Sequence, residues 1–195
     1  PPPVAPLAGV FEVIRNAKQP MLGVCGGHQQ IALAYRAEVD LMERLHPGEG
    51  YEGAKRERGF FPVEADGEGI FKGLPASVTV WHSHCDEVKS LPEGFHVTAS
   101  NETCPIQAMQ HDERPVFGVQ FHPELFDDTH PDGRGVLDLA AGEIRGVAGE
   151  VGDDEEAGLG CRGHAPTLDL GVAPMSRPLV NFVRRGALPW CLAAN

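Results

Sequence analysis

The spacing of hydrophobic residues at the start of the chain switches between two periods. An apolar stripe at helical spacing precedes Pro20, and a short continuous apolar run follows it, which is typical of a buried strand. Apolar residues then return to helical spacing after residue 27. The elements expected are a helix over 6–18, a strand over 21–24, a helix over 28–36 and a strand over 38–42.

The middle of the chain favours strands. Short runs rich in β-branched and aromatic residues are separated by Gly, Pro and Asp turns. These runs cover 60–65, 78–83, 95–100, 106–110 and 116–121. A helix–strand–helix unit followed by a strand-rich half predicts an α/β fold.

The pattern weakens after Phe126. Residues 133–145 could form a helix, and we expect the core domain to cover 1–140. Residues 141–178 are rich in Gly and acidic residues, which predicts a flexible segment. Residues 179–195 are expected to form a short helix and tail.

Net charge and cysteine content limit the classes of function and the cellular compartment expected for the chain. A net charge of −12 over 195 residues argues against a surface for nucleic acid or anionic membrane. No apolar run approaches the roughly 18 residues that a membrane helix needs. The five cysteines form no CxxC pair, so reduced thiols in the cytoplasm are expected.

Cys25 lies where the predicted strand meets the predicted helix, in the stretch GVCGG. This is a cysteine version of the G-x-S-x-G corner that presents a nucleophile to substrate. The positive end of the helix would favour the thiolate, and the backbone N–H of Gly26 could meet an oxyanion. The alternative is a buried cysteine before glycines that only let helix and strand pack closely.

A base for such a cysteine is offered by His122-Pro123-Glu124, at the end of the last predicted strand. Residues two apart in an extended segment point the same way, so Glu124 could orient His122. The alternative is a strand-ending turn with an acidic residue on the surface. The two motifs support each other, because a cysteine nucleophile needs a base.

The two motifs together resemble the class I glutamine amidotransferase family. PMLGVCGGHQ and GVQFHPE match both of its signature blocks, and residues 6–140 are similar overall. The resemblance implies a three-layer, flavodoxin-like α/β fold with a mostly parallel central sheet flanked by helices. It implies that Cys25 is the nucleophile, His122 the general acid/base and Glu124 the orienting acid. The substrate would be L-glutamine, hydrolysed through a cysteinyl thioester.

The resemblance also implies partners and binding residues. Ammonia would pass to a synthetase subunit or domain, and no cofactor or metal is implied. Gly26 would supply an oxyanion donor. Gln29 would face the pocket or cap its own helix. Ser83 and His84 fall on a strand whose backbone grips the substrate in the family, although His84 could instead stand behind the site or on the surface.

Further interpretations stay open at this point. The family carries a strand–helix unit and a Gly-rich oxyanion loop before the position of Pro1, so we expect an N-terminally truncated chain. A γ-glutamyl hydrolase of the same fold, or an inactive domain that only binds a partner, would share these motifs. A metal site built on His82 and His84, with His122 joining them, is a further alternative.

Overall fold

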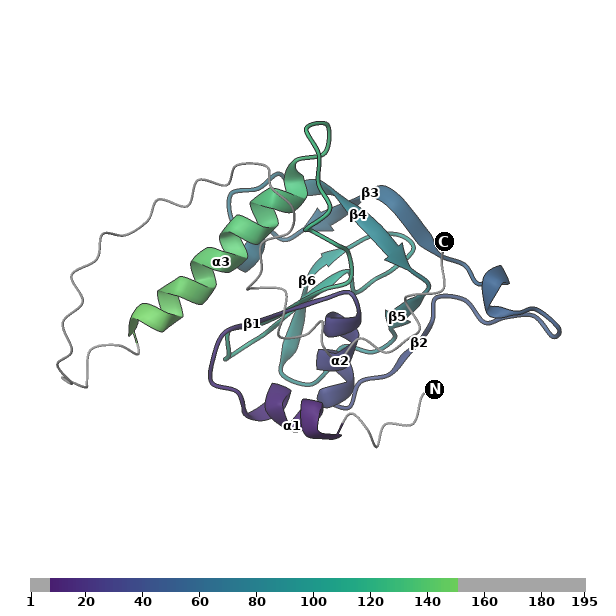
Figure 1. Cartoon of the computed structure of the whole chain (residues 1–195), viewed down its shortest axis with the longest axis horizontal. Coiled ribbons are helices and arrows are strands. Elements are labelled where there is room, and N and C mark those ends of the chain that lie inside the picture. The colour runs from purple at the N-terminus through teal and green to yellow at the C-terminus, as the bar shows by residue number, and fades with distance from the viewer. Residues whose placement is uncertain (1–7, 151–195) are drawn as a thin grey trace.

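A computed structural model of the chain describes residues 8–150. Its centre is a sheet of six strands with helices on both faces (Figure 1). In order across the sheet, the strands are β1 (Met21–Val24), β8 (Val116–Val119), β7 (Ala108–His111), β6 (Phe95–Ser100), β3 (Glu57–Ala65) and β4 (Ser77–His84). The predicted α/β class is therefore confirmed.

The direction of the strands corrects one detail of the expected fold. Within residues 8–150 only β1 and β8 pair in parallel, and the other neighbours in this sheet are antiparallel. The expectation of a mostly parallel sheet is therefore not met there. The cause lies in the connections: β6, β7 and β8 follow one another through short links, which allow only antiparallel pairing, whereas a parallel pair needs a long crossover.

Two hydrophobic cores fill the spaces between the sheet and its helices. One lies under α1 (Ala8–Asn16) and α2 (Gly26–Ala34), and the other lies under α3 (Asp132–Glu150). Strand β8 contributes side chains to both cores, because Val116 packs into the first core while Phe117 and Val119 pack into the second. This alternation of side chains is the physical origin of the three layers that the resemblance implied.

A second, smaller sheet lies beside α2. Strand β2 (Val39–Leu41) pairs antiparallel with β5 (Asp86–Val88). The sequence predicted β2 but missed β5, a segment of three residues that carries two acidic side chains. Two short 3₁₀ turns connect strands of the two sheets: η2 (Tyr51–Gly53) lies between β2 and β3 in the chain, and η3 (Gly69–Phe71) lies between β3 and β4.

The last described element is α3, which agrees in kind with the helix expected over 133–145. It runs on to Glu150 and so passes residue 140, where we expect the core domain to end. The division of the chain into domains stays a prediction. The segment from 151 to 178 and the expected helix and tail over 179–195 lie outside the described residues.

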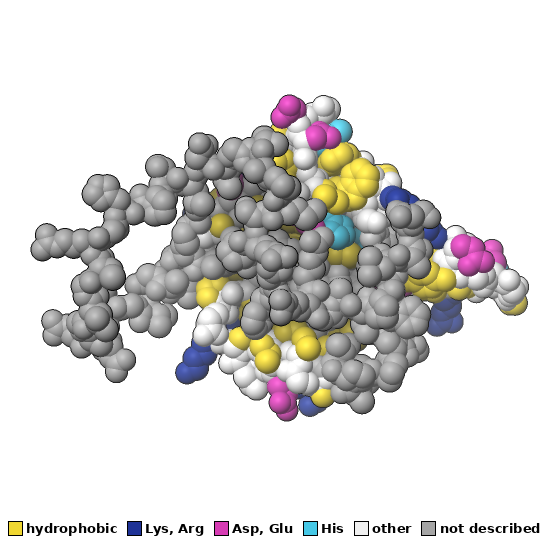
Figure 2. All heavy atoms as spheres, viewed as in Figure 1, with side chains coloured by type: hydrophobic (Ala, Val, Ile, Leu, Met, Phe, Trp, Pro, Cys, Tyr) yellow, Lys and Arg dark blue, Asp and Glu magenta, His cyan; other side chains and the backbone are white. Residues whose placement is uncertain are grey.

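The surface agrees with the acidic composition. Figure 2 shows acidic side chains at two projecting ends, on the loop before α3 and on the segment around η2. Exposed acidic residues of these segments include Asp127, Asp128, Glu49 and Glu52. Among residues 8–150, no helix is long and apolar enough to span a membrane.

Candidate active site

Cys25 occupies a sharp corner between β1 and α2. Its backbone N–H donates to the carbonyl of Val119 on β8, at 2.8 Å, so the corner is tied to the neighbouring strand. Its φ is 51° and its ψ is −106°, a positive-φ conformation that residues with a side chain adopt rarely and at a cost of about 1–3 kcal/mol. The side chain is only 6% exposed. This is the strained geometry expected for the strand-to-helix corner of a nucleophile.

Glycine is required beside this corner because the helix passes so close to the strand. A Cβ placed on Gly23 would lie 2.6 Å from the backbone carbonyl of Gly27, closer than such atoms approach. Helix α2 begins at Gly26, directly after the cysteine. The first backbone N–H groups of a helix have no acceptor within it, so they offer hydrogen bonds to a negative charge near the sulfur.

His122 and Glu124 form a close pair just beyond β8. His122 Nδ1 lies 2.9 Å from Glu124 Oε1, and each side chain is 24% exposed. The backbone N–H of His122 donates to the carbonyl of Trp81 on β4, at 2.7 Å, which fixes the position of this residue. Because β1 and β8 run in parallel, Cys25 and His122 both follow the carboxyl ends of adjacent strands.

Gln29 faces across the site rather than along its own helix. Its Nε2 donates to the backbone carbonyl of Asp86, at 3.1 Å, and to Oε1 of Gln120, at 3.2 Å. The helix-capping interpretation is therefore wrong for this side chain. Neither bond uses the carbonyl oxygen of Gln29, which leaves this oxygen able to accept a further hydrogen bond.

Ser83 and His84 point to opposite faces of β4. Ser83 is exposed on the same face as Trp81, whose carbonyl holds His122. His84 is buried: its Nε2 lies 2.8 Å from Glu57 Oε2, and its Nδ1 lies 3.1 Å from the carbonyl of Asp86. The surface interpretation of His84 is therefore wrong, and the structure agrees with a histidine that stands behind the site.

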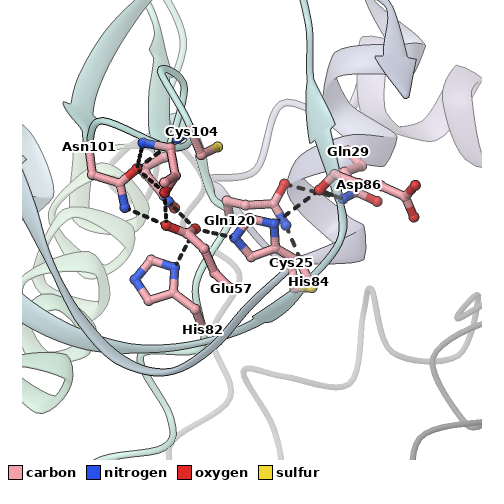
Figure 3. A network of polar contacts seen from close by, with 11 residues as sticks. Cys25, Gln29, Glu57, His82, His84, Asp86, Asn101, Cys104 and Gln120 are labelled. Atoms are coloured by element: carbon pink, nitrogen blue, oxygen red, sulfur yellow. Dashed lines mark hydrogen bonds and ion pairs between the residues drawn. The ribbon is translucent and has the colours of Figure 1, made fainter. Parts of the chain in front are cut away.

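The structure reveals a polar cluster around a buried carboxylate, which the sequence did not predict. Its centre is the carboxylate of Glu57, which is paired opposite His84 in the β3–β4 register (Figure 3). Four side chains hydrogen-bond to this carboxylate: His84, Asn101, Thr103 and Gln107. His82 Nδ1 lies 3.2 Å from it as well. We call these six residues the Glu57 cluster.

The charge of Glu57 is stabilised by this surrounding shell. Burial alone would raise the pKa of its carboxyl group, because a buried charge loses its hydration. The donors His82, His84, Thr103 and Asn101 outweigh burial, and the pKa of Glu57 is lowered well below its usual value. The cluster therefore holds an ionised carboxylate in the interior of the protein.

The arrangement also bears on the metal alternative. Within residues 8–150, one atom each of Glu57, His82 and His84 lie within 4.8 Å of one another, whereas His122 is not part of this group. Asn101 and Thr103 donate to one oxygen of this carboxylate, and Gln107 and His84 contact the other, so its roughly four lone-pair sites are already occupied. The donor set therefore favours a hydrogen-bonded anion over a metal centre.

The fold, the strained cysteine and the His122–Glu124 pair together define a class of protein. The family model for class-I glutamine amidotransferases matches residues 3–134, well over half of the chain. The chain therefore belongs to the class I glutamine amidotransferase family, as its two motifs predicted.

Particular relatives narrow the comparison further. The chain is 46% identical over 122 residues to a glutamine-hydrolysing GMP synthase subunit of Pyrococcus furiosus, covering 62% of this chain and 59% of that protein. It is 42% identical over 125 residues to the GMP synthase subunit of the same name from Methanocaldococcus jannaschii, covering 64% and 61%. The chain thus spans about three fifths of the length of these curated relatives. The expected N-terminal truncation stays a prediction.

A solved structure agrees with this comparison. The crystal structure of a Thermoplasma acidophilum protein, which is also named for a GMP synthase subunit, superposes with a TM-score of 0.64 at 33% identity. The match covers 74% of this chain and 67% of that one.

Proposed function

We propose that this chain hydrolyses the side-chain amide of L-glutamine and supplies the ammonia to a synthetase partner. The observation that carries the proposal is the meeting of two features at one sheet edge. Cys25 is held in a positive-φ corner at the start of α2, and the adjacent parallel strand leads into the hydrogen-bonded pair His122–Glu124. A nucleophile and an oriented base are the two parts that acyl transfer requires.

In the proposed reaction, the Cys25 thiolate attacks the side-chain carbonyl carbon of glutamine. The carbon–nitrogen bond then breaks, and His122 gives a proton to the departing ammonia. His122 next takes a proton from water, which attacks the γ-glutamyl thioester. Glutamate leaves and the thiolate is restored, so atoms and charge balance over the cycle. Glu124 orients the imidazole and stabilises its charged form.

The remaining predicted site residues take binding roles in this proposal. The backbone N–H of Gly26 donates to the oxyanion of each tetrahedral intermediate. Gln29 turns its carbonyl oxygen toward the substrate's ammonium group, since its N–H groups are engaged by Asp86 and Gln120. The backbone of β4 at Ser83 and His84 grips the α-amino and carboxylate groups.

The partner is proposed from the relatives. Both curated proteins are named as subunits of a glutamine-hydrolysing synthase, which fits a chain that makes ammonia for chemistry performed elsewhere. We place the chain and its partner in the cytoplasm, because five cysteines without a CxxC pair fit a protein that carries reduced thiols.

The experiment compares glutamate release from L-glutamine by the full chain and by its Cys25→Ala variant. We expect the variant to lose at least about a thousandfold in rate, as triad knockouts do. Cys104→Ala serves as the matched control, because this thiol is also buried but lies in the loop between β6 and β7. Equal rates in the wild type and Cys25→Ala would sink the proposal. A γ-glutamyl peptide run beside glutamine tests the hydrolase alternative.

A further inference from the structure

Gln120 is a fully buried polar residue that the proposed reaction does not yet use. It lies between the end of β8 and His122, and none of its surface is exposed. Its side-chain Nε2 lies 3.8 Å from the Sγ of Cys25 (Figure 3). A carboxamide donor is thus directed at the atom that would attack the substrate.

Hydrogen bonds fix which end of the Gln120 amide faces the sulfur. Its Oε1 accepts from Nε2 of Gln29, at 3.2 Å. An amide whose oxygen is engaged on one side must present its NH₂ group on the other. The backbone N–H of Gln120 donates to the carbonyl of Gln107, at 2.7 Å, so the main chain is held as well.

Gln29 and Gln107, the two residues that hold Gln120, are both connected to the Glu57 cluster by hydrogen bonds. Gln29 also donates to the carbonyl of Asp86, which lies 3.1 Å from His84, and His84 contacts Glu57 at 2.8 Å. Gln107 donates directly to Glu57, at 2.7 Å. Figure 3 shows this continuous series of polar contacts between the buried carboxylate and Cys25.

We propose that Gln120 is a further catalytic residue, whose side-chain N–H donates to the Cys25 thiolate and holds the sulfur in place for attack. The Glu57 cluster is the anchor that keeps this donor oriented. A hydrogen bond to a charged acceptor is about twice as strong as one between neutral groups, and more so in a buried site. The proposal rests on the proposed function, since it gives Gln120 a role in the same reaction.

The test measures the thiol itself, without glutamine. The full chain is alkylated with iodoacetamide from about pH 5 to about pH 10, a range that brackets the usual thiol titration near 8.5. Modification of the Cys25 peptide is followed by mass spectrometry. Gln120→Met keeps the shape of the side chain and removes the donor, whereas Gln120→Glu replaces the donor with a negative charge.

We expect the midpoint of Cys25 alkylation to move upward by about one pH unit in Gln120→Met, the loss of one charge-assisted hydrogen bond. Gln120→Glu should move it further in the same direction. His122 and Glu124, the hydrogen-bonded pair at the same sheet edge, are unchanged in every variant. Thr98→Val is the matched control, because Thr98 is buried in β6 and its Oγ1 makes no hydrogen bond within the described residues. Its midpoint should equal that of the wild type.

A second variant covers the case in which Gln120→Met does not fold. Gln29→Met removes the donor that orients the Gln120 amide, at a position only partly buried. We expect a smaller upward shift in this variant. Circular dichroism identifies which of the two variants is folded, and an unchanged midpoint in either folded variant overturns the proposal. A fall in activity without such a shift indicates a packing role, which also overturns it.

The outcome is separable from that of the proposed function. If Cys25 alkylation depends on Gln120 while glutamine is not hydrolysed, the glutaminase proposal fails and the role of Gln120 stands. If glutamine is hydrolysed but the alkylation midpoint is the same with and without Gln120, the glutaminase proposal stands and the role of Gln120 fails.

Discussion

The corner at Cys25 and the Glu57 cluster lie close to each other but are built in opposite ways. The corner is made from consecutive residues, and its strain is visible in the positive φ of Cys25. The cluster joins Glu57 to residues that lie 25 to 50 positions further along the chain, all directed at its carboxylate. Short-range geometry thus presents the sulfur, whereas long-range hydrogen bonds fix the side chains behind it.

This difference shows that the backbone strain lies at the Cys25 corner, whereas the hydrogen bonds that hold the site rigid come from the Glu57 cluster. A residue in an unfavourable backbone conformation persists only where its surroundings hold it there. Cys25 is tied to Val119 on one side and faces Gln120 on the other. We therefore expect substitutions in the Glu57 cluster to cause the larger loss in the free energy of unfolding. Substitutions at the corner should mainly change how closely α2 approaches β1.

The largest effect is expected for Glu57→Ala. This change removes the acceptor for four hydrogen-bonding side chains, of which His84 and Gln107 are buried, and it typically costs about 3–5 kcal/mol in the free energy of unfolding. Urea denaturation measures the loss. Glu64→Ala on the same strand is the control, because Glu64 is exposed and should change stability by less than about 0.5 kcal/mol. Similar losses in both variants would contradict the role of the cluster.

The two regions should lose their contributions to the free energy of unfolding in different pH ranges. Burial lowers the pKa of His28, on α2, to about 4 from its ordinary value of 6.5. Between these values the unfolded chain binds a proton that the folded chain does not. The free energy of unfolding should therefore fall by up to about 3 kcal/mol as the pH drops through this window. Glu57, whose pKa is lowered, stabilises the fold above its ordinary value of 4.5 and loses this contribution only below it.

Urea denaturation at a series of pH values checks this expectation. His28→Leu should flatten the dependence between about pH 6.5 and about pH 4.5, because it removes the group that titrates there. A smaller slope should remain from His111, whose pKa is also lowered by its partial burial. A slope that is the same with and without His28 contradicts the assignment.

The smallest effect is expected for Gly23→Ala. The new methyl group would lie 2.6 Å from the backbone of Gly27, so α2 must move away from β1 at a cost of about 1–3 kcal/mol. Thermal unfolding measures this change. Gly9→Ala in α1 is the control, because no atom lies within 4 Å of the added group, and it should gain up to about 1 kcal/mol. A stable Gly23→Ala protein would show that the close approach is not required.

The sequence could predict most of the fold because its signals are local. The apolar spacing located α1, β1 and α2, and the turn residues separated the later strands. The mixed direction of the sheet was missed, since the resemblance suggested parallel strands while the short links between β6, β7 and β8 enforce antiparallel ones. β5 was missed because three residues give too little periodicity to recognise.

The candidate site was predictable only in part, for the same reason. Cys25, His122 and Glu124 stand in short motifs, so their residue types and spacing suffice to find them. Glu57 and Gln120 carry no motif of their own that points to the sulfur. Glu57 stands among charged residues that resemble a surface segment, and only the pairing of β3 with β4 turns it toward His84. One sign was present, because His82 and His84 share a strand face.

The central claim is that Cys25 is a nucleophile with a glutamine site around it. The most direct measurement is covalent labelling of the full chain by a glutamine-mimicking electrophile, with peptide mapping of every cysteine. Burial, with the carboxylates of Glu87 and Glu57 nearby, raises the pKa of the Cys104 thiol, which makes it a poor competitor. We predict that the label falls on Cys25 alone and that excess L-glutamine slows it. Equal labelling of Cys85, or labelling of Cys25 that glutamine does not slow, would contradict the account.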